Sequence, residues 1–171
     1  LCSDFLALRL NFFEEDPHPW ALQEKKHAEL LLSGNALLLN LFDSVCAYYY
    51  ALMRLPDKIP QTFRQHNLTE VHYLRPAFPM MKLIENQVFL AQNSCIDVLG
   101  QVDSLLALCR QFHYKLCEIH VLIQAAGASN ALQYYTEAEN YLKTALKLAE
   151  PDHLLVPFCE NYYYIKELLV N

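Results

Sequence analysis

The sequence predicts an all-α fold: a right-handed array of antiparallel helix hairpins of the tetratricopeptide type (a TPR-like α-α superhelix). Apolar residues recur at steps of three and four along most of the chain, which is the spacing of a helix that buries one side. The 171 residues include only three glycines, whereas a β protein rich in hairpins needs glycine in its turns. An apolar content of 54% is enough for a packed core. We therefore expect residues 1–171 to form a single helical-repeat domain.

Three helices are expected in the first third of the chain, over residues 3–15, 20–32 and 35–55. Gly34, between the second and the third, suits the left-handed conformation that follows many helix ends. The run Tyr48-Tyr49-Tyr50 could serve as an aromatic ligand platform. Consecutive helical residues point about 100° apart, however, so we expect two of these tyrosines to pack in the core.

Three further helices are expected in the middle of the chain. A short helix is expected over Pro60–His66, then one over 76–86 and another over 90–110, with a junction near Gln87. Gly100 interrupts the last of these at a cost of about 1 kcal/mol relative to alanine, which indicates close packing at that position.

Residues 113–132 and 135–149 predict the hairpin around which the other helices are organised. The first of its helices is apolar on most sides, which is typical of a helix enclosed by neighbours. Small residues at 125–129 allow a second helix to approach closely, and Pro151 ends that second helix. The predicted pairs are 20–32 with 36–54, 76–86 with 90–110, and 113–132 with 135–149.

The run LKTALKLAEPDHLLVPFCEN, from Leu142 to Asn161, resembles the end of the helical-repeat domain in the large ATP-binding LuxR-type transcription activators, the family of the maltose-regulon activator. In that family a helix ending AL-x-LA-x-P is followed by a loop resembling V/M-P-F-x-E and a short apolar segment. The matching positions are Ala145, Leu146, Leu148, Ala149, Pro151, Pro157, Phe158 and Glu160, followed by Ile165, Leu168 and Leu169. The stretch Asn35 to Phe63 resembles clostridial-type members, with matches at Lys58, Ile59, Pro60 and Phe63.

This resemblance implies the sensor or interaction segment of a bacterial, cytoplasmic transcriptional regulator. Such regulators carry a nucleotide-binding module before the repeats and a helix-turn-helix reader after them. The chain opens inside an apolar periodic segment without an initiator methionine, so we expect a fragment of a longer protein. An effector small molecule or a partner protein would bind the concave face. Its binding would control self-association of the full-length protein, including homo-oligomer formation, and its DNA binding. The alternatives are a stand-alone adaptor that binds a peptide or protein, and a helical enzyme or metal protein.

Composition and motifs narrow the function further. The formal net charge of −6 disfavours direct nucleic-acid contact by this segment, because such contacts rest on lysine and arginine. No apolar run reaches the length of a membrane span, so no membrane association is expected. Neither a glycine-rich phosphate loop nor a hydrolase motif is present. We therefore expect a protein that is not an enzyme and has no cofactor in this segment.

One constellation invites interpretation as a metal site: Cys109, His113, Cys117 and His120, at steps of four, four and three. Four ligands on consecutive helical turns span about 16 Å, too far for one ion. A helix boundary is also expected near Phe112. The six cysteines are therefore expected to be reduced and mostly buried, with no metal bound.

The candidate ligand groove comes from the tetratricopeptide pattern. Alignment of Ala126 and Ala138 with its small positions turns His120, Gln124, Gly127 and Asn130 towards the concave face. Polar side chains on an apolar helix need partners, which can be a ligand, solvent or a neighbouring helix. The predicted groove residues are His120, Gln124 and Asn130. The tyrosines at 162–164 are expected to dock a tail helix on the end of the array.

Overall fold

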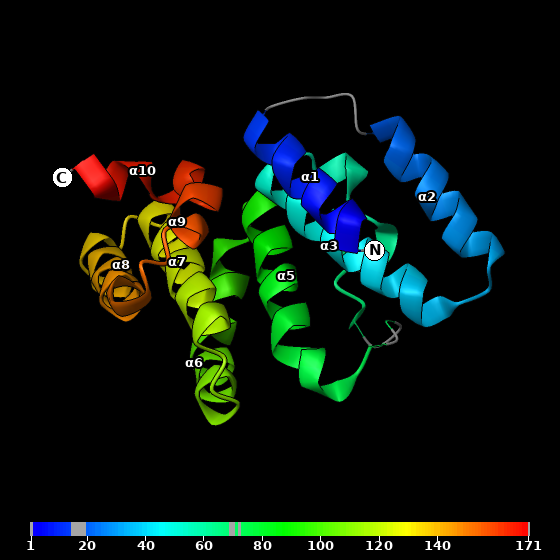
Figure 1. Ribbon diagram of the computed structural model, residues 1–171. Coiled ribbons are helices and arrows are strands. Elements are labelled where there is room, and N and C mark those ends of the chain that lie inside the picture. The colour runs from blue at the N-terminus through cyan, green and yellow to red at the C-terminus, as the bar shows by residue number, and fades with distance from the viewer. Residues whose placement is uncertain (1, 15–19, 69–70, 72, 171) are drawn as a thin grey trace.

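The computed structural model describes residues 2–14, 20–68, 71 and 73–170, and within these ranges it contains helices and turns but no strand. The all-α prediction is therefore confirmed (Figure 1). None of the helices in this part of the chain combines the length and apolar character that a membrane span requires. The α-helices are α1 (Cys2–Glu14), α2 (Trp20–Leu32), α3 (Ala36–Leu52), α4 (Gln61–Arg64), α5 (Phe78–Ala91), α6 (Cys95–Gln111), α7 (Lys115–Ala131), α8 (Tyr135–Ala149), α9 (Val156–Glu160) and α10 (Tyr162–Val170). Short 3₁₀ turns cover Pro56–Lys58, Arg75–Ala77 and Glu150–Asp152.

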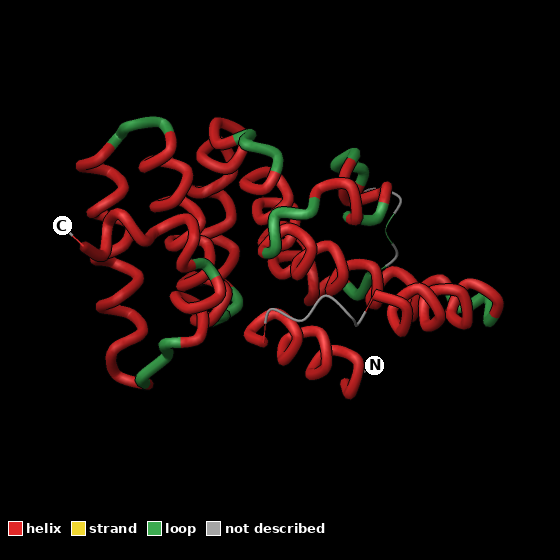
Figure 2. Tube along the Cα trace, turned by 90° about the horizontal axis from the view of Figure 1, so that it is seen from above, coloured by secondary structure: helices red, strands yellow, loops and turns green. Residues whose placement is uncertain are grey.

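The longer helices pack in chain order. Helix α5 contacts α3 on one side and both α6 and α7 on the other, and α7 contacts α5, α6 and α8. Figure 2 shows helices side by side with short loops at their ends. Helix α7 is buried almost all round from Cys117 to Ser129, as its apolar sequence predicts. Its Ala126 and the facing Ala138 of α8 are both fully buried, which lets these two helices approach closely.

The three turns that join α5 to α6, α6 to α7 and α7 to α8 share one geometry. Each has a left-handed residue in the middle, and these residues lie 20 positions apart: Asn93 (φ 60°), His113 (φ 55°) and Gln133 (φ 64°). In each turn the next backbone N–H donates to a carbonyl five residues earlier, the closing bond of a Schellman motif. These bonds are Ser94 to Phe89, Tyr114 to Cys109 and Tyr134 to Ser129, each 2.8 Å long. The chain thus repeats its helix length and turn without repeating its sequence.

The predicted junction near Gln87 is wrong, because α5 continues through it to Ala91. The polar residues there look like a helix end, but the structure turns them inward. Gln87 is fully buried, and its Oε1 accepts a hydrogen bond of 2.8 Å from Gln124 Nε2 on α7. A polar residue can stay inside a helical core when a neighbouring helix supplies its partner.

The glycines follow the predictions only in part. Gly34 has φ +66°, as expected for the residue after α2. Gly100 is exposed, and a Cβ added there would meet no described atom within 4 Å, so the predicted close packing is wrong. Close packing occurs instead at Gly127, where an added Cβ would lie 2.9 Å from the Cβ of Tyr164.

The tail helices α9 and α10 lie across α7 (Figure 1). Tyr164 packs on Gly127, and its hydroxyl donates to the carbonyl of Ala51 near the end of α3, at 3.3 Å. The ring of Tyr163 lies 4.1 Å from the guanidinium of Arg54. The tail helix therefore docks on α7 and α8, the last hairpin of the array, and also reaches α3, while Tyr162 is exposed.

Candidate functional site: a pocket between α3, α5 and α7

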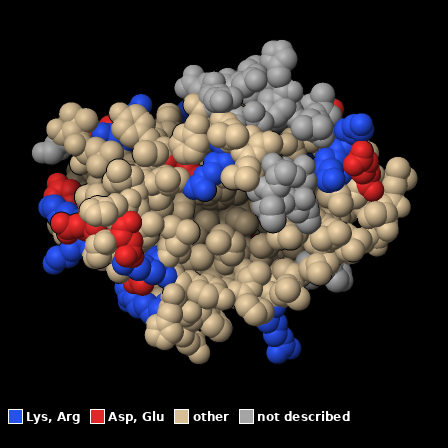
Figure 3. All heavy atoms as spheres, viewed as in Figure 1, with Lys and Arg blue, Asp and Glu red and all other residues tan. Residues whose placement is uncertain are grey.

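A cavity of about 330 Å³ opens where α3, α5 and α7 meet, and residues of α1 and α9 line one of its ends. Figure 3 shows a hollow near the middle of this face, with uncharged residues around it and charged side chains at its upper edge. Most of the wall is apolar, because each of the three helices turns aliphatic or thioether side chains inward. Representative wall residues are Leu41 and Val45 of α3, Met81 and Ile84 of α5, and Leu116 of α7.

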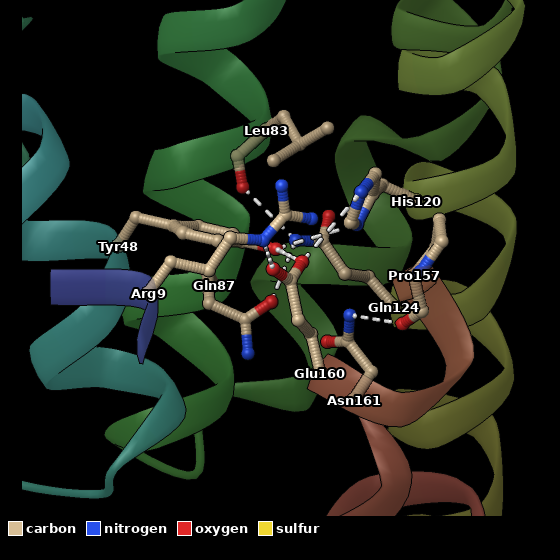
Figure 4. Close-up of polar contacts among 9 residues, drawn as sticks. All are labelled: Arg9, Tyr48, Leu83, Gln87, His120, Gln124, Pro157, Glu160 and Asn161. Carbon is tan, nitrogen blue, oxygen red and sulfur yellow. Dashed lines mark hydrogen bonds and ion pairs between the residues drawn. The ribbon is translucent and has the colours of Figure 1, made fainter. Parts of the chain in front are cut away.

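The polar end of the pocket is organised by Glu160 of α9. Its Oε1 lies 2.9 Å from Nε of Arg9 on α1, and its Oε2 accepts a hydrogen bond of 3.1 Å from the hydroxyl of Tyr48 on α3 (Figure 4). The Glu160 side chain is 3% exposed, whereas that of Arg9 is 43% exposed. Burial raises the pKa of Glu160, while Arg9 and Tyr48 oppose that rise. The carboxylate is thus a desolvated charge held by partners from two other helices.

His120 of α7 faces the same cluster. Its Nδ1 lies 3.4 Å from the Tyr48 hydroxyl, and its Nε2 lies 4.0 Å from Glu160 Oε2. Burial lowers the pKa of His120 to about 4, and the positive charge of Arg9 contributes to that lowering. The imidazole is therefore neutral near pH 7, so the 4.0 Å approach to Glu160 is not an ion pair. A neutral imidazole offers one hydrogen-bond donor and one acceptor.

Gln124, one turn further along α7, does not line the pocket. It is fully buried, and its Nε2 donates to the carbonyl of Leu83 at 3.0 Å as well as to Gln87. These two bonds tie α7 to α5. Gln124 Oε1 and Gln87 Nε2 have no hydrogen-bond partner within the described ranges. Gln124 thus holds together two of the helices that form the pocket.

Asn130 lies near the far end of α7, outside the pocket. Its Nδ2 is 3.4 Å from Glu167 Oε2 on α10. Gly127, which the sequence pattern also turns towards the groove, is covered by Tyr164. The tail helix therefore occupies the part of the α7 face that the pattern leaves open. Of the predicted groove residues, only His120 reaches the pocket.

Sequence reasoning did not predict that Arg9, Tyr48 and Glu160 would form part of the site. Arg9 and Glu160 are 151 positions apart, and no pattern in the chain links them. Glu160 carries a local signal, since it is the one acidic residue in the run from Val156 to Ile165. Two tyrosines of the Tyr48–Tyr50 run, Tyr49 and Tyr50, are buried as expected, and Tyr48 and Tyr49 both line the pocket.

The four residues considered as zinc ligands do not converge. Cys117 is the largest influence on the pKa of the Cys109 thiol, which it raises, and Cys109 is the largest influence on the pKa of the Cys117 thiol, which it lowers. His113 is exposed in the turn between α6 and α7, and His120 faces Tyr48. In the ranges that the structure describes, no three His, Cys, Asp or Glu side chains gather closely enough to hold a metal.

Comparisons of this chain with models of protein families, with curated proteins and with solved structures give no match.

Proposed function

We propose that this domain binds a small amphipathic effector in the α3–α5–α7 pocket and is the sensor segment of a cytoplasmic LuxR-type transcriptional regulator. The observation that carries the proposal is an apolar cavity with polar groups from four helices gathered at one end. Its volume of about 330 Å³ falls at the lower end of the range for small-molecule sites, which are mostly apolar with a few polar groups that fix orientation.

The polar end indicates the ligand's chemistry. The charges of Arg9 and Glu160 compensate each other, and His120 is neutral because its pKa is lowered to about 4. A charged ligand would bring an unpaired charge next to a desolvated carboxylate, which is costly. The proposed effector is therefore uncharged, with an apolar body against Val45 and Ile84 and a hydroxyl or amide group near Tyr48 and His120.

The site's position suggests how binding is transmitted. An effector in the pocket touches α1 and α9 as well as the three walls, and α9 leads directly into α10. Binding that favours one placement of these helices biases self-association and DNA binding by the full-length regulator. The domain itself, with a net charge of −6, makes no direct nucleic-acid contact and needs no cofactor in this account.

The tetratricopeptide-like, right-handed arrangement is part of the same proposal. It is supported by helices that contact their next and next-but-one neighbours, and by three equivalent turns spaced 20 residues apart. The LuxR assignment is supported by the motif from Leu142 to Asn161, whose Glu160 lies at the polar end of the pocket.

A peptide-binding adaptor is the second candidate, and one observation favours it. Three apolar pocket residues are substantially exposed: Leu41 (39%), Met80 (40%) and Leu116 (47%). Such a rim could hold a side chain of an extended peptide. If a small apolar compound saturates the pocket without any peptide present, the effector site is favoured over the adaptor.

The test is a fluorescence titration with the neutral apolar dye N-phenyl-1-naphthylamine. The wild-type domain is expected to bind one equivalent saturably. Val45→Trp fills the pocket and should weaken binding by about tenfold or more. Ile96→Trp adds the same ring on the outside of α6, where Ile96 is 74% exposed, and should leave binding unchanged. Circular dichroism confirms that both variants fold. Dye binding that is unsaturable, or equal in all three proteins, would refute the proposal.

A further inference from the structure

A second cavity, of about 560 Å³, lies between α2, α3 and the segment that leads into α4. Its described lining residues are all different from those of the α3–α5–α7 pocket. Phe42, Asp43, Cys46 and Tyr50 of α3 line this cavity, while Leu41, Val45 and Tyr48 line the other. The two cavities therefore lie on different sides of one helix.

One wall of this second cavity carries hydrogen-bond acceptors without donors. Gln23 of α2 is only 3% exposed, and its Oε1 is buried with no partner among the residues described. Asp43 Oδ1 is also buried with no hydrogen bond among the residues described, although His27 Nε2 lies 3.3 Å away. A buried acceptor with no donor is costly, so both oxygens favour a donor placed in the cavity.

Negative charge gathers at the same wall. Burial raises the pKa of Asp43, and His27 opposes that rise. The pKa of Tyr50 is raised by burial and also by the nearby charges of Glu24 and Asp43, which places the three side chains together. Lys58 also lines the cavity and is exposed, but it is not among the groups that shift the pKa of Asp43. Among the residues that the structure describes, His27 is the one neighbour that lowers the pKa of this half-buried carboxyl.

We propose that this cavity binds a small organic cation, an alkylguanidinium, whose N–H groups donate to Gln23 Oε1 and Asp43 Oδ1. A guanidinium supplies several planar donors at once and is weakly hydrated, so it can enter a half-buried site. Phe42 and Pro60 give the alkyl chain apolar surface. Glu24 adds attraction at the rim, and Lys58 favours a ligand whose far end is neutral or negative. His27 competes with the ligand for Asp43.

The test compares butylguanidinium with its neutral analogue butylurea by amide chemical-shift titration of the ¹⁵N-labelled domain. Butylguanidinium is expected to bind saturably, with shifts centred on Gln23 and Asp43. Butylurea should bind about tenfold more weakly, because it lacks the charge. A cavity that holds only water would give no saturable shifts with either compound, which would overturn the proposal.

Variants sharpen the result. Asp43→Asn should weaken butylguanidinium binding by about tenfold, whereas Asp97→Asn, at an exposed site on α6, should not change it. His27→Ala should strengthen binding, because it removes the competitor for Asp43. A general attraction of cations to an acidic protein predicts equal small losses for both aspartate variants. That result, or weaker binding in His27→Ala, would refute a specific site. Thermal unfolding of each variant checks that it folds.

Discussion

Arg9 and Glu160 form an ion pair of 2.9 Å that joins the first helix to the ninth at the polar end of the central pocket. The two residues differ in solvent exposure, at 43% for the Arg9 side chain and 3% for that of Glu160. The arginine is therefore partly screened by water, while the carboxylate depends on Arg9 and Tyr48 for its stabilisation.

Removal of Arg9 tests this dependence. Arg9→Met keeps a long apolar stem but leaves Glu160 buried without its counter-charge. Because Arg9 is partly exposed, we expect a loss of about 1–2 kcal/mol in the free energy of unfolding, measured with urea. Arg9→Met combined with Glu160→Gln should recover part of this loss, because it removes the uncompensated charge. Additive losses in the double variant would show that the two residues do not interact.

His120 should make stability depend on pH. Its pKa is about 4 in the folded state, against 6.5 for a histidine exposed to water in the unfolded chain, so between these limits the unfolded chain binds more protons. Stability from this residue therefore rises with pH from 4 to 6.5, by about 3 kcal/mol in all, and is fully present above pH 6.5. Glu160 acts in the opposite sense, because its raised pKa means that the folded state holds its proton more tightly.

The measurement is urea unfolding of wild type and His120→Gln across this pH range. The unfolding free energy of wild type minus that of His120→Gln should increase as the pH rises from 4 to 6.5. His113→Gln, at the exposed turn between α6 and α7, serves as the matched control and should follow wild type. A pH profile of His120→Gln parallel to wild type would contradict the assignment of a buried neutral imidazole.

Gly127 and Gly100 make a matched pair for the packing of the tail helix. An added Cβ at Gly127 would lie 2.9 Å from Tyr164 Cβ, whereas the same Cβ at Gly100 meets no described atom within 4 Å. Gly127→Ala should destabilise the domain by about 1–3 kcal/mol through overpacking. Gly100→Ala should stabilise it by about 1 kcal/mol, because alanine is the better helix former. Thermal unfolding of both variants is the measurement. Equal changes in stability for Gly127→Ala and Gly100→Ala would rule out tight docking of α10 on α7.

The left-handed turn residues predict a gain in stability. Gln133 has φ 64° and an exposed side chain, so Gln133→Gly should relieve backbone strain without loss of a contact. We expect about 1 kcal/mol of stabilisation, measured by urea unfolding. Glycine at Gln101, within α6, should instead cost about 1 kcal/mol. Destabilisation by Gln133→Gly would contradict the left-handed conformation of Gln133.

Much of the helical framework could be predicted from the sequence. The 3.6-residue period, Gly34 and Pro151 locate helices α2, α3, α7 and α8, because local spacing and backbone restrictions act within a few residues. The predicted end of α5 was wrong, since Gln87 is polar yet inside the core. Its partner Gln124 lies 37 positions away, and no local pattern reports such a pairing.

The candidate site was predictable only where one helix face decides it. His120 lies on the face of α7 that the repeat pattern turns towards the groove, and it reaches the pocket. Arg9, Tyr48 and Glu160 come from three other helices, so their meeting depends on how the whole chain packs. The docking of α10 over Gly127 likewise follows from tertiary packing, and Asn130 contacts this helix rather than the pocket.

The location of the bound dye tests the central claim most directly. Amide shifts of the ¹⁵N-labelled domain on addition of N-phenyl-1-naphthylamine should cluster at Val45, Ile84 and Leu116, which line the α3–α5–α7 pocket. A larger hollow, of about 1040 Å³, lies between α8 and α9 and is lined by Leu146 and Phe158 among others. Shifts centred on that hollow, with Val45, Ile84 and Leu116 unmoved, would contradict a ligand site between α3, α5 and α7.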